Sequence, residues 1–187
     1  MAKKNVGINM LQKSSDNEWY TPESAIQMLE DHLRQSKFPP NSNTTVWECF
    51  GKDFSYIESP QYIKNLGYNV IADGEDFWRN CKGDLVISNG PYSTPKGERN
   101  IKERIIERLC ELNIPFCLLM PTSYLQTKSF KKMVDKYGNF QFIVPCKKIQ
   151  FYKVDLITKE KLKKNNCSFY TCWYCWNMGF QNDFTML

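Results

Sequence analysis

The chain alternates short apolar runs with segments of mixed apolar and polar residues, and this alternation predicts its elements. Residues 21–36 are expected to form a helix, with Thr21 as the N-cap and Pro22 at the first helical position. Further helices are expected over 58–66, 98–113 and 129–138. Apolar runs typical of strands occupy 44–50, 68–73, 84–89, 114–121, 140–145, 147–154 and 167–178.

Helices that alternate with short apolar strands indicate an α/β domain, in which helices cover both faces of a mostly parallel sheet. The strands over 147–154 and 167–178 are separated by a basic loop instead of a helix, so they are expected to pair as a C-terminal antiparallel hairpin. We expect one domain over 1–187, with residues 1–15 flexible.

Three polar residues end predicted strands. In an open parallel sheet, ligands bind at the carboxyl ends of the strands. This rule selects Glu48, Asp73 and Asn89 as candidate site residues.

The sequence Asn89-Gly90-Pro91-Tyr92 follows directly from one of these strands. The Asn89 side chain and the Gly90 backbone offer carbonyl acceptors, Pro91 stiffens the loop, and Tyr92 offers a ring for stacking. Two acceptors and a ring suit a planar base with an exocyclic amine. Turn chemistry alone explains the same tetrapeptide equally well.

Several motifs occur in an order that narrows this choice. Residues 46–53 resemble the first glycine motif of the S-adenosylmethionine-dependent methyltransferases, and residues 70–73 resemble their second strand with its terminal acid. Asp76-Phe77 resembles the Asp-Phe pair that follows, residues 88–93 the Asn-Pro-Pro-Tyr motif, and residues 17–22 the segment that closes over the cofactor. Over residues 16–178 the order is similar to that of the (N/D)PPY amino-methyltransferases, in particular short phage-type and large-DNA-virus adenine-N6 DNA methyltransferases.

The resemblance implies an enzyme that uses S-adenosylmethionine, releases S-adenosylhomocysteine and methylates adenine N6 in DNA by direct in-line transfer. It implies catalytic roles for Asn89, Gly90, Pro91 and Tyr92, and nucleic-acid contacts from Tyr92, Ser93, Lys147 and Lys148. The residues implied for cofactor binding are Trp19, Tyr20, Thr21, Pro22, Glu48, Cys49, Phe50, Gly51, Asp73, Asp76, Phe77 and Asn89.

The sequence departs from the family pattern at two places. Gly90 stands where the first proline is usual, and Lys52-Asp53 stand where a second small residue is common. RNA or a protein amide is therefore an alternative acceptor, and a non-catalytic nucleic-acid-binding or partner subunit is a further alternative. We expect no large separate target-recognition domain, and therefore weak sequence specificity, a partner subunit or a homodimer.

The formal charge of +5 and the pI near 8.7 suit transient contact with a polyanion, but they also suit many proteins that never bind one. Seven lysines between 147 and 164 are expected either to contact phosphates or to form a solvated loop. Arg99, Lys102 and Arg104 follow the Asn89 loop, and pairing with Glu103 and Glu107 explains them equally well.

Eight cysteines raise the question of disulfides or zinc. The N-terminus resembles no signal peptide and no run is long enough to span a membrane, so we expect an intracellular, reducing location in the cytoplasm or a host cell, without membrane association. Cys172 and Cys175 lie in a predicted strand and would face opposite sides of the sheet, so no metal site is expected.

Overall fold

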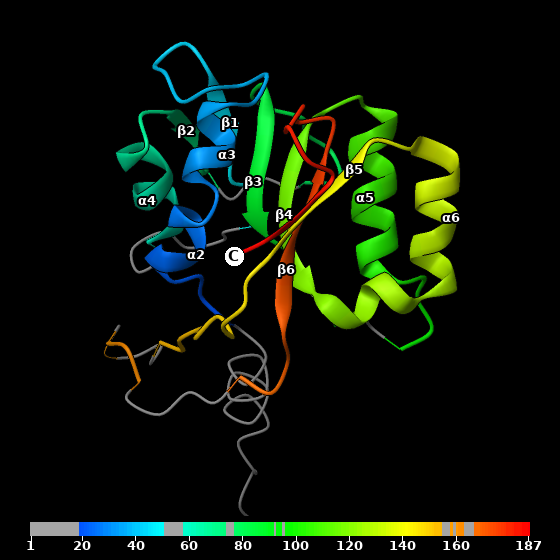
Figure 1. The fold of residues 1–187 in the computed structure, drawn as a ribbon. Helices are drawn as coiled ribbons and strands as arrows, with labels where there is room; N and C mark the ends of the chain where they lie inside the picture. Colours follow the sequence, from blue (N-terminus) through cyan, green and yellow to red (C-terminus); the bar gives the residue numbers. More distant parts are fainter. Residues whose placement is uncertain are drawn as a thin grey trace, which may run out of the picture.

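The computed structural model describes residues 19–50, 58–73, 77–91, 93–94, 96–154, 158, 160–162 and 167–187. One seven-stranded sheet forms the centre of this part of the chain (Figure 1). Its strands lie in the order β2 (Asn69–Ile71), β1 (Thr45–Trp47), β3 (Leu85–Asn89), β4 (Phe116–Pro121), β6 (Thr171–Trp176), β5 (Phe140–Val144) and β7 (Phe184–Met186).

The first four strands of this order run parallel, β6 is antiparallel to both β4 and β5, and β7 is parallel to β5. Helices α2 (Glu23–Gln27), α3 (Glu30–Arg34) and α4 (Ser59–Asn65) cover one face of the sheet. Helices α5 (Ile101–Glu111) and α6 (Lys128–Tyr137), with the 3-10 helix η1 (Thr122–Gln126), cover the other. The α/β class and the mostly parallel sheet expected from the sequence are confirmed.

Two apolar cores lie between the sheet and the helix layers. Successive residues of a strand point to opposite faces, so Leu85 and Ile87 pack under α2–α4 whereas Val86 packs under α5. Cys175 lies in the core beneath α2–α4 and Cys172 in the core beneath α5, which confirms that they face opposite sides of the sheet.

The helix expected over 21–36 is divided at Met28 and Leu29 into α2 and α3. Helix α2 begins at Glu23, with Pro22 as its N-cap and no side-chain capping bond, so the prediction of Thr21 as the N-cap was wrong. Pro22 has an extended backbone (φ −73°, ψ 156°), which leaves Thr21 one residue too far from the first turn. The Thr21 side chain is buried.

The C-terminal hairpin is present, but its first strand is not the one expected. Strand β5 pairs with β6, while residues 147–154 form only isolated bridges, Tyr152 with Tyr20 and Val154 with Lys161. Ile149 and Phe151 are buried in the core beneath α2–α4. The apolar residues of this run therefore pack into that core, although the run is not a strand of the sheet. Strand β7 was not foreseen, because three residues carry too little periodicity to be recognised.

The expected ends of α4 and α6 are confirmed to within a residue or two. The Thr127 hydroxyl accepts a hydrogen bond from the Phe130 N–H and caps α6. Gly67 follows α4 with a φ of +110°, a conformation that glycine adopts without strain. Among the described helices, none is long and apolar enough to cross a membrane.

Candidate active site

The carboxyl ends of three neighbouring strands lie side by side at one end of the sheet. Trp47 is paired with Ile71 on one side and with Val86 on the other. Glu48 follows Trp47 directly, and its N–H donates to the Ile71 carbonyl at 2.9 Å. The predicted site residues Glu48, Asp73 and Asn89 therefore come from adjacent strands at the same edge, where the β3 arrow ends in Figure 1.

Glu48 is a buried carboxylate, only 4% exposed. The hydroxyl of Ser88, which is also buried, donates a hydrogen bond to Glu48 Oε1. Burial holds the pKa of the neighbouring Cys49 thiol well above its usual value, and the negative charge of Glu48 adds to this effect. The raised pKa favours the protonated form of the Cys49 thiol.

Asn89, at the end of β3, is linked to the N-terminal segment. Its Nδ2 donates to the Trp19 carbonyl at 3.0 Å. A carbonyl oxygen can only accept, so this contact requires the NH2 end of the amide to face Trp19 and turns Oδ1 to the opposite side. Tyr20 exchanges backbone hydrogen bonds with Tyr152, 2.9 and 3.3 Å long, so residues 19–22 lie between Asn89 and the 147–154 segment.

Gly90 is closely packed. A Cβ placed on it would lie 3.3 Å from Cε2 of Phe50 and 3.6 Å from Cδ1 of Ile105. Its φ is not in the left-handed region, so packing and not backbone conformation explains the glycine. Pro91 and Ser93 are exposed, while Tyr92 lies outside the described residues.

Aromatic rings form a wall beside Gly90. The Phe77 ring lies 4.8 Å from Phe50, 5.8 Å from Trp47 and 4.9 Å from Trp78, measured between centroids. Phe77 is buried and Phe50 is half-buried, so Phe77 supports Phe50 from behind. Gly51, Lys52, Asp53 and Asp76, also singled out from the sequence, lie outside the described residues.

Two arginines of α5 hold the loop that carries Phe77. Arg108 Nε donates to the Phe77 carbonyl at 3.0 Å, and its Nη2 donates to the Asn80 carbonyl at 3.1 Å. The Arg104 guanidinium lies 4.4 Å from the centroid of Trp78. Sequence reasoning missed Arg108, because helical spacing places it beside other charged residues and gives no sign of a contact 31 residues away.

Asp73 has a partner that the sequence did not indicate. Lys82 Nζ forms an ion pair and hydrogen bond with Asp73 Oδ2. Both side chains are partly exposed. The strand end therefore carries a carboxylate that is positioned by a neighbouring cation.

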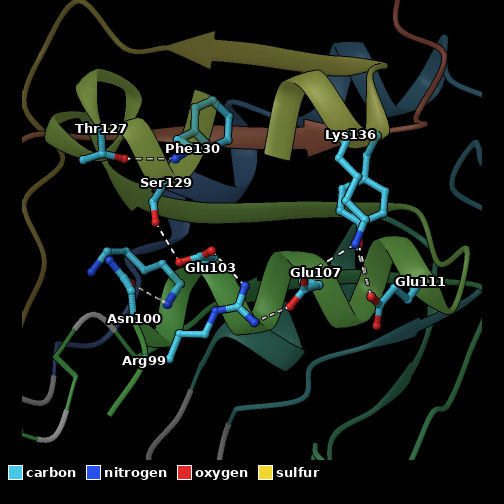
Figure 2. A network of polar contacts seen from close by, with 11 residues as sticks. Arg99, Asn100, Glu103, Glu107, Glu111, Thr127, Ser129, Phe130 and Lys136 are labelled. Carbon is cyan, nitrogen blue, oxygen red and sulfur yellow. Dashed lines mark hydrogen bonds and ion pairs between the residues drawn. The ribbon is translucent and has the colours of Figure 1, made fainter. Parts of the chain in front are cut away.

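The charged residues after the Asn89 loop are largely engaged in pairing. Arg99 binds Glu103 at 2.8 Å and Glu107 at 2.6 Å, and Arg104 binds Glu98 at 3.0 Å. Figure 2 shows the Arg99 pairs within a network that joins α5 to α6 through Ser129 and Lys136. Burial lowers the pKa of Lys102. Of the two readings left open above, ion pairing therefore accounts for Arg99 and Arg104.

Lys147 and Lys148 differ in their surroundings. Lys147 is exposed. Lys148 is half-buried, donates through Nζ to the Cys167 carbonyl, and lies 5.3 Å from the ring centroid of Tyr170. Within the described ranges, no group of three or more His, Cys, Asp or Glu side chains is arranged to hold a metal ion.

No protein-family model matches the sequence. No curated protein matches it either. Among solved structures, the chain is similar to a candidate class I S-adenosylmethionine-dependent methyltransferase of Listeria monocytogenes, with a TM-score of 0.52 and 13% identity. The match covers 90% of this chain and 65% of that one. At this identity the likeness shows the fold alone, and the fold is the α/β arrangement expected from the sequence.

Proposed function

We propose that the protein is an S-adenosylmethionine-dependent methyltransferase that methylates an exocyclic amino group, adenine N6 in DNA, by direct in-line transfer. The observation that carries this proposal is the orientation of Asn89, whose NH2 end is held by the Trp19 carbonyl at 3.0 Å. The acceptor oxygen Oδ1 then points away from the Trp19 carbonyl, and Asn89 itself lies at the end of the sheet that also bears Glu48 and Asp73. The fold shared with the Listeria protein supports the same class.

The residues at this edge fit the proposed cofactor. S-adenosylmethionine, when bound, supplies the methyl group, and S-adenosylhomocysteine is the product. Asp73 offers carboxylate oxygens to ribose hydroxyls, and Lys82 holds that carboxylate in place. Phe50 offers ring surface to an adenine. The proposed cofactor site is covered on one side by residues Trp19, Tyr20, Thr21 and Pro22. Contacts with Asn89 and Tyr152 hold this segment in place.

The acceptor amine is expected to bind at Asn89 and Gly90. Asn89 Oδ1 and the Gly90 carbonyl each accept one of the two amine protons, which directs the nitrogen lone pair toward the methyl group. Pro91 stiffens this loop and Tyr92 stacks on the base. Rate acceleration then comes mainly from position and orientation. No thiolate is needed for this transfer, in agreement with the raised pKa of the Cys49 thiol.

The close packing of Gly90 bears on the non-catalytic alternative. That alternative treats Gly90 as a sign of lost function. The Phe50 ring, 3.3 Å from the Cβ position, gives a structural reason for glycine that does not involve loss of activity. An enzyme is therefore the better-supported proposal.

The test is to incubate the protein with methyl-labelled S-adenosylmethionine and, separately, duplex DNA, single-stranded DNA and RNA. The products are digested to nucleosides and analysed by mass spectrometry. N6-methyladenine that disappears with Asn89→Ala supports the proposal. A matched control is Asn65→Ala, because Asn65 lies exposed on α4 and bonds only to Gln61 among the contacts resolved for it. No methylated base in any polymer, with S-adenosylhomocysteine binding intact, would overturn it.

A further inference from the structure

The positive charge of the protein is concentrated in one segment. Residues 146–170 contain seven lysines and two acids, a net charge of +5. The whole chain has 25 basic and 20 acidic residues, so the remainder has eighteen of each and is neutral. A local excess of this kind attracts a polyanion to one place on the surface.

The described part of this segment lies at the edge that carries Asn89. Tyr152 pairs with Tyr20, next to Trp19, whose carbonyl binds Asn89. At its far end the Tyr170 carbonyl accepts from the Thr122 N–H at 2.9 Å, directly after β4. In Figure 1 the gold chain after β5 and the orange chain before β6 accordingly lie beyond the arrowhead of β3. The lysines of this segment that the structure describes (Lys147, Lys148, Lys153 and Lys161) thus lie on the side of the sheet that carries the candidate active site.

Lysines and aromatic rings alternate along this edge. Lys153 Nζ lies 4.8 Å from the Trp19 ring centroid, Lys161 Nζ lies 4.5 Å from Tyr152, and Lys148 lies 5.3 Å from Tyr170. Trp19 also meets Phe169 edge to face at 6.0 Å, and Tyr20 stacks on Tyr152 at 5.7 Å. Lys161 Nζ is also ion-paired with Glu58 Oε2 at 2.5 Å, so it is left out. We name the five residues Trp19, Lys148, Tyr152, Lys153 and Tyr170 the aromatic–lysine edge.

Tyr170 differs from the other rings because it is 65% exposed. An exposed ring beside a lysine suits a nucleotide, because the base can stack on the ring while the phosphate forms an ion pair with the lysine ammonium. In a duplex both faces of each base are already covered by neighbours. Over its described residues the segment 146–170 contains no helix and only isolated bridges, so it lacks the elements that read a major groove.

We infer that the aromatic–lysine edge binds a single-stranded nucleic acid and delivers an unpaired adenine to Asn89. The inference rests on the proposed function and specifies the form of its acceptor. An unpaired base also avoids the unstacking cost of about a few kcal/mol that a duplex substrate imposes.

The experiment measures binding by fluorescence anisotropy, with a labelled twelve-nucleotide single strand that contains one adenine among thymines and with the corresponding duplex. The single strand is expected to bind at least tenfold more tightly than the duplex. Tyr170→Ala is expected to weaken single-strand binding roughly 5- to 150-fold, which corresponds to the loss of one stacked base. Lys153→Gln is expected to reduce the slope of log K against log salt by about 0.7.

The chain provides a matched control on α6. Lys136 lies 4.7 Å from the ring of Tyr137, a similar lysine–ring pair on the other face of the sheet. Tyr137→Ala and Lys136→Gln should leave single-strand affinity unchanged. Equal or tighter duplex binding, or equal effects of Tyr170→Ala and Tyr137→Ala, would overturn the inference.

Separate measurements distinguish this inference from the proposed function. S-adenosylhomocysteine binding is followed by calorimetry on the same proteins. Tight single-strand binding that depends on Tyr170, without cofactor binding or methylation, supports the edge and overturns the enzyme. Cofactor binding and methylation without a single-strand preference overturn the edge alone.

Discussion

Asn89 and Trp19 are seventy residues apart in the chain, and the amide nitrogen of one donates to the backbone carbonyl of the other at 3.0 Å. This contact links the end of β3 to the segment that precedes α2. It also determines which end of the Asn89 amide is turned toward Trp19. One hydrogen bond therefore both anchors the N-terminal segment and orients the residue to which we assign amine binding.

Asn89→Asp is expected to break this link, because a carboxylate oxygen would replace the donor and face the Trp19 carbonyl. We expect a loss of about 1–3 kcal/mol in the free energy of unfolding, and faster hydrogen exchange at the Tyr20 amide. Urea unfolding and exchange mass spectrometry measure the two effects. Unchanged exchange at Tyr20 would show that the contact does not anchor the segment.

Ser88→Ala is expected to leave the buried Glu48 carboxylate without its hydroxyl donor. Such a loss costs about 1–3 kcal/mol of stability, and we expect weaker S-adenosylhomocysteine binding, since Glu48 would no longer be held in one orientation. A double-mutant cycle with Glu48→Met, which removes the acceptor oxygen, followed by urea unfolding and calorimetry, measures the coupling. Additive effects of the two substitutions would contradict a direct interaction.

Gly90→Ala is expected to destabilise the protein by about 1 kcal/mol or more, because the new methyl group lies too close to the Phe50 ring. Phe50→Leu in the same chain should recover most of this loss, since it removes the ring atoms in question. Thermal unfolding of the two single variants and the double variant tests this. If the double variant is no more stable than Gly90→Ala, the contact with Phe50 is not the reason for glycine.

The sequence was sufficient for the parallel part of the fold and for the placement of three candidate residues at one end of the sheet. The runs that carry Glu48, Asp73 and Asn89 at or near their carboxyl ends are short and apolar, so these ends could be placed at one side of the sheet from the pattern alone. Residues 147–154 were misassigned, because burial of Ile149 and Phe151 beneath α2–α4 produces the same apolar pattern as a strand. Lys82 and Arg108 could not be found from the sequence, since their partners are set by tertiary packing.

The buried thiols predict how stability depends on pH. Burial raises the pKa of both Cys110 and Cys172 to about 12, from a usual value of 9.0. Above pH 9 the unfolded chain releases these protons while the folded protein retains them, so the unfolded state binds fewer protons and stability falls as pH rises toward 12. Below pH 9 both states are protonated and the two thiols contribute no slope. Each thiol contributes a fall of up to about 1.4 kcal/mol per pH unit in that window.

Urea unfolding between pH 8 and 10.5, in the presence of reductant, should show this decline, and Cys110→Ala should make it shallower. Cys81 is exposed and serves as the control, because Cys81→Ala should leave the slope unchanged. A slope above pH 9 that is identical in all three proteins would mean that the buried Cys110 thiol ionises as readily in the folded protein as in the unfolded chain.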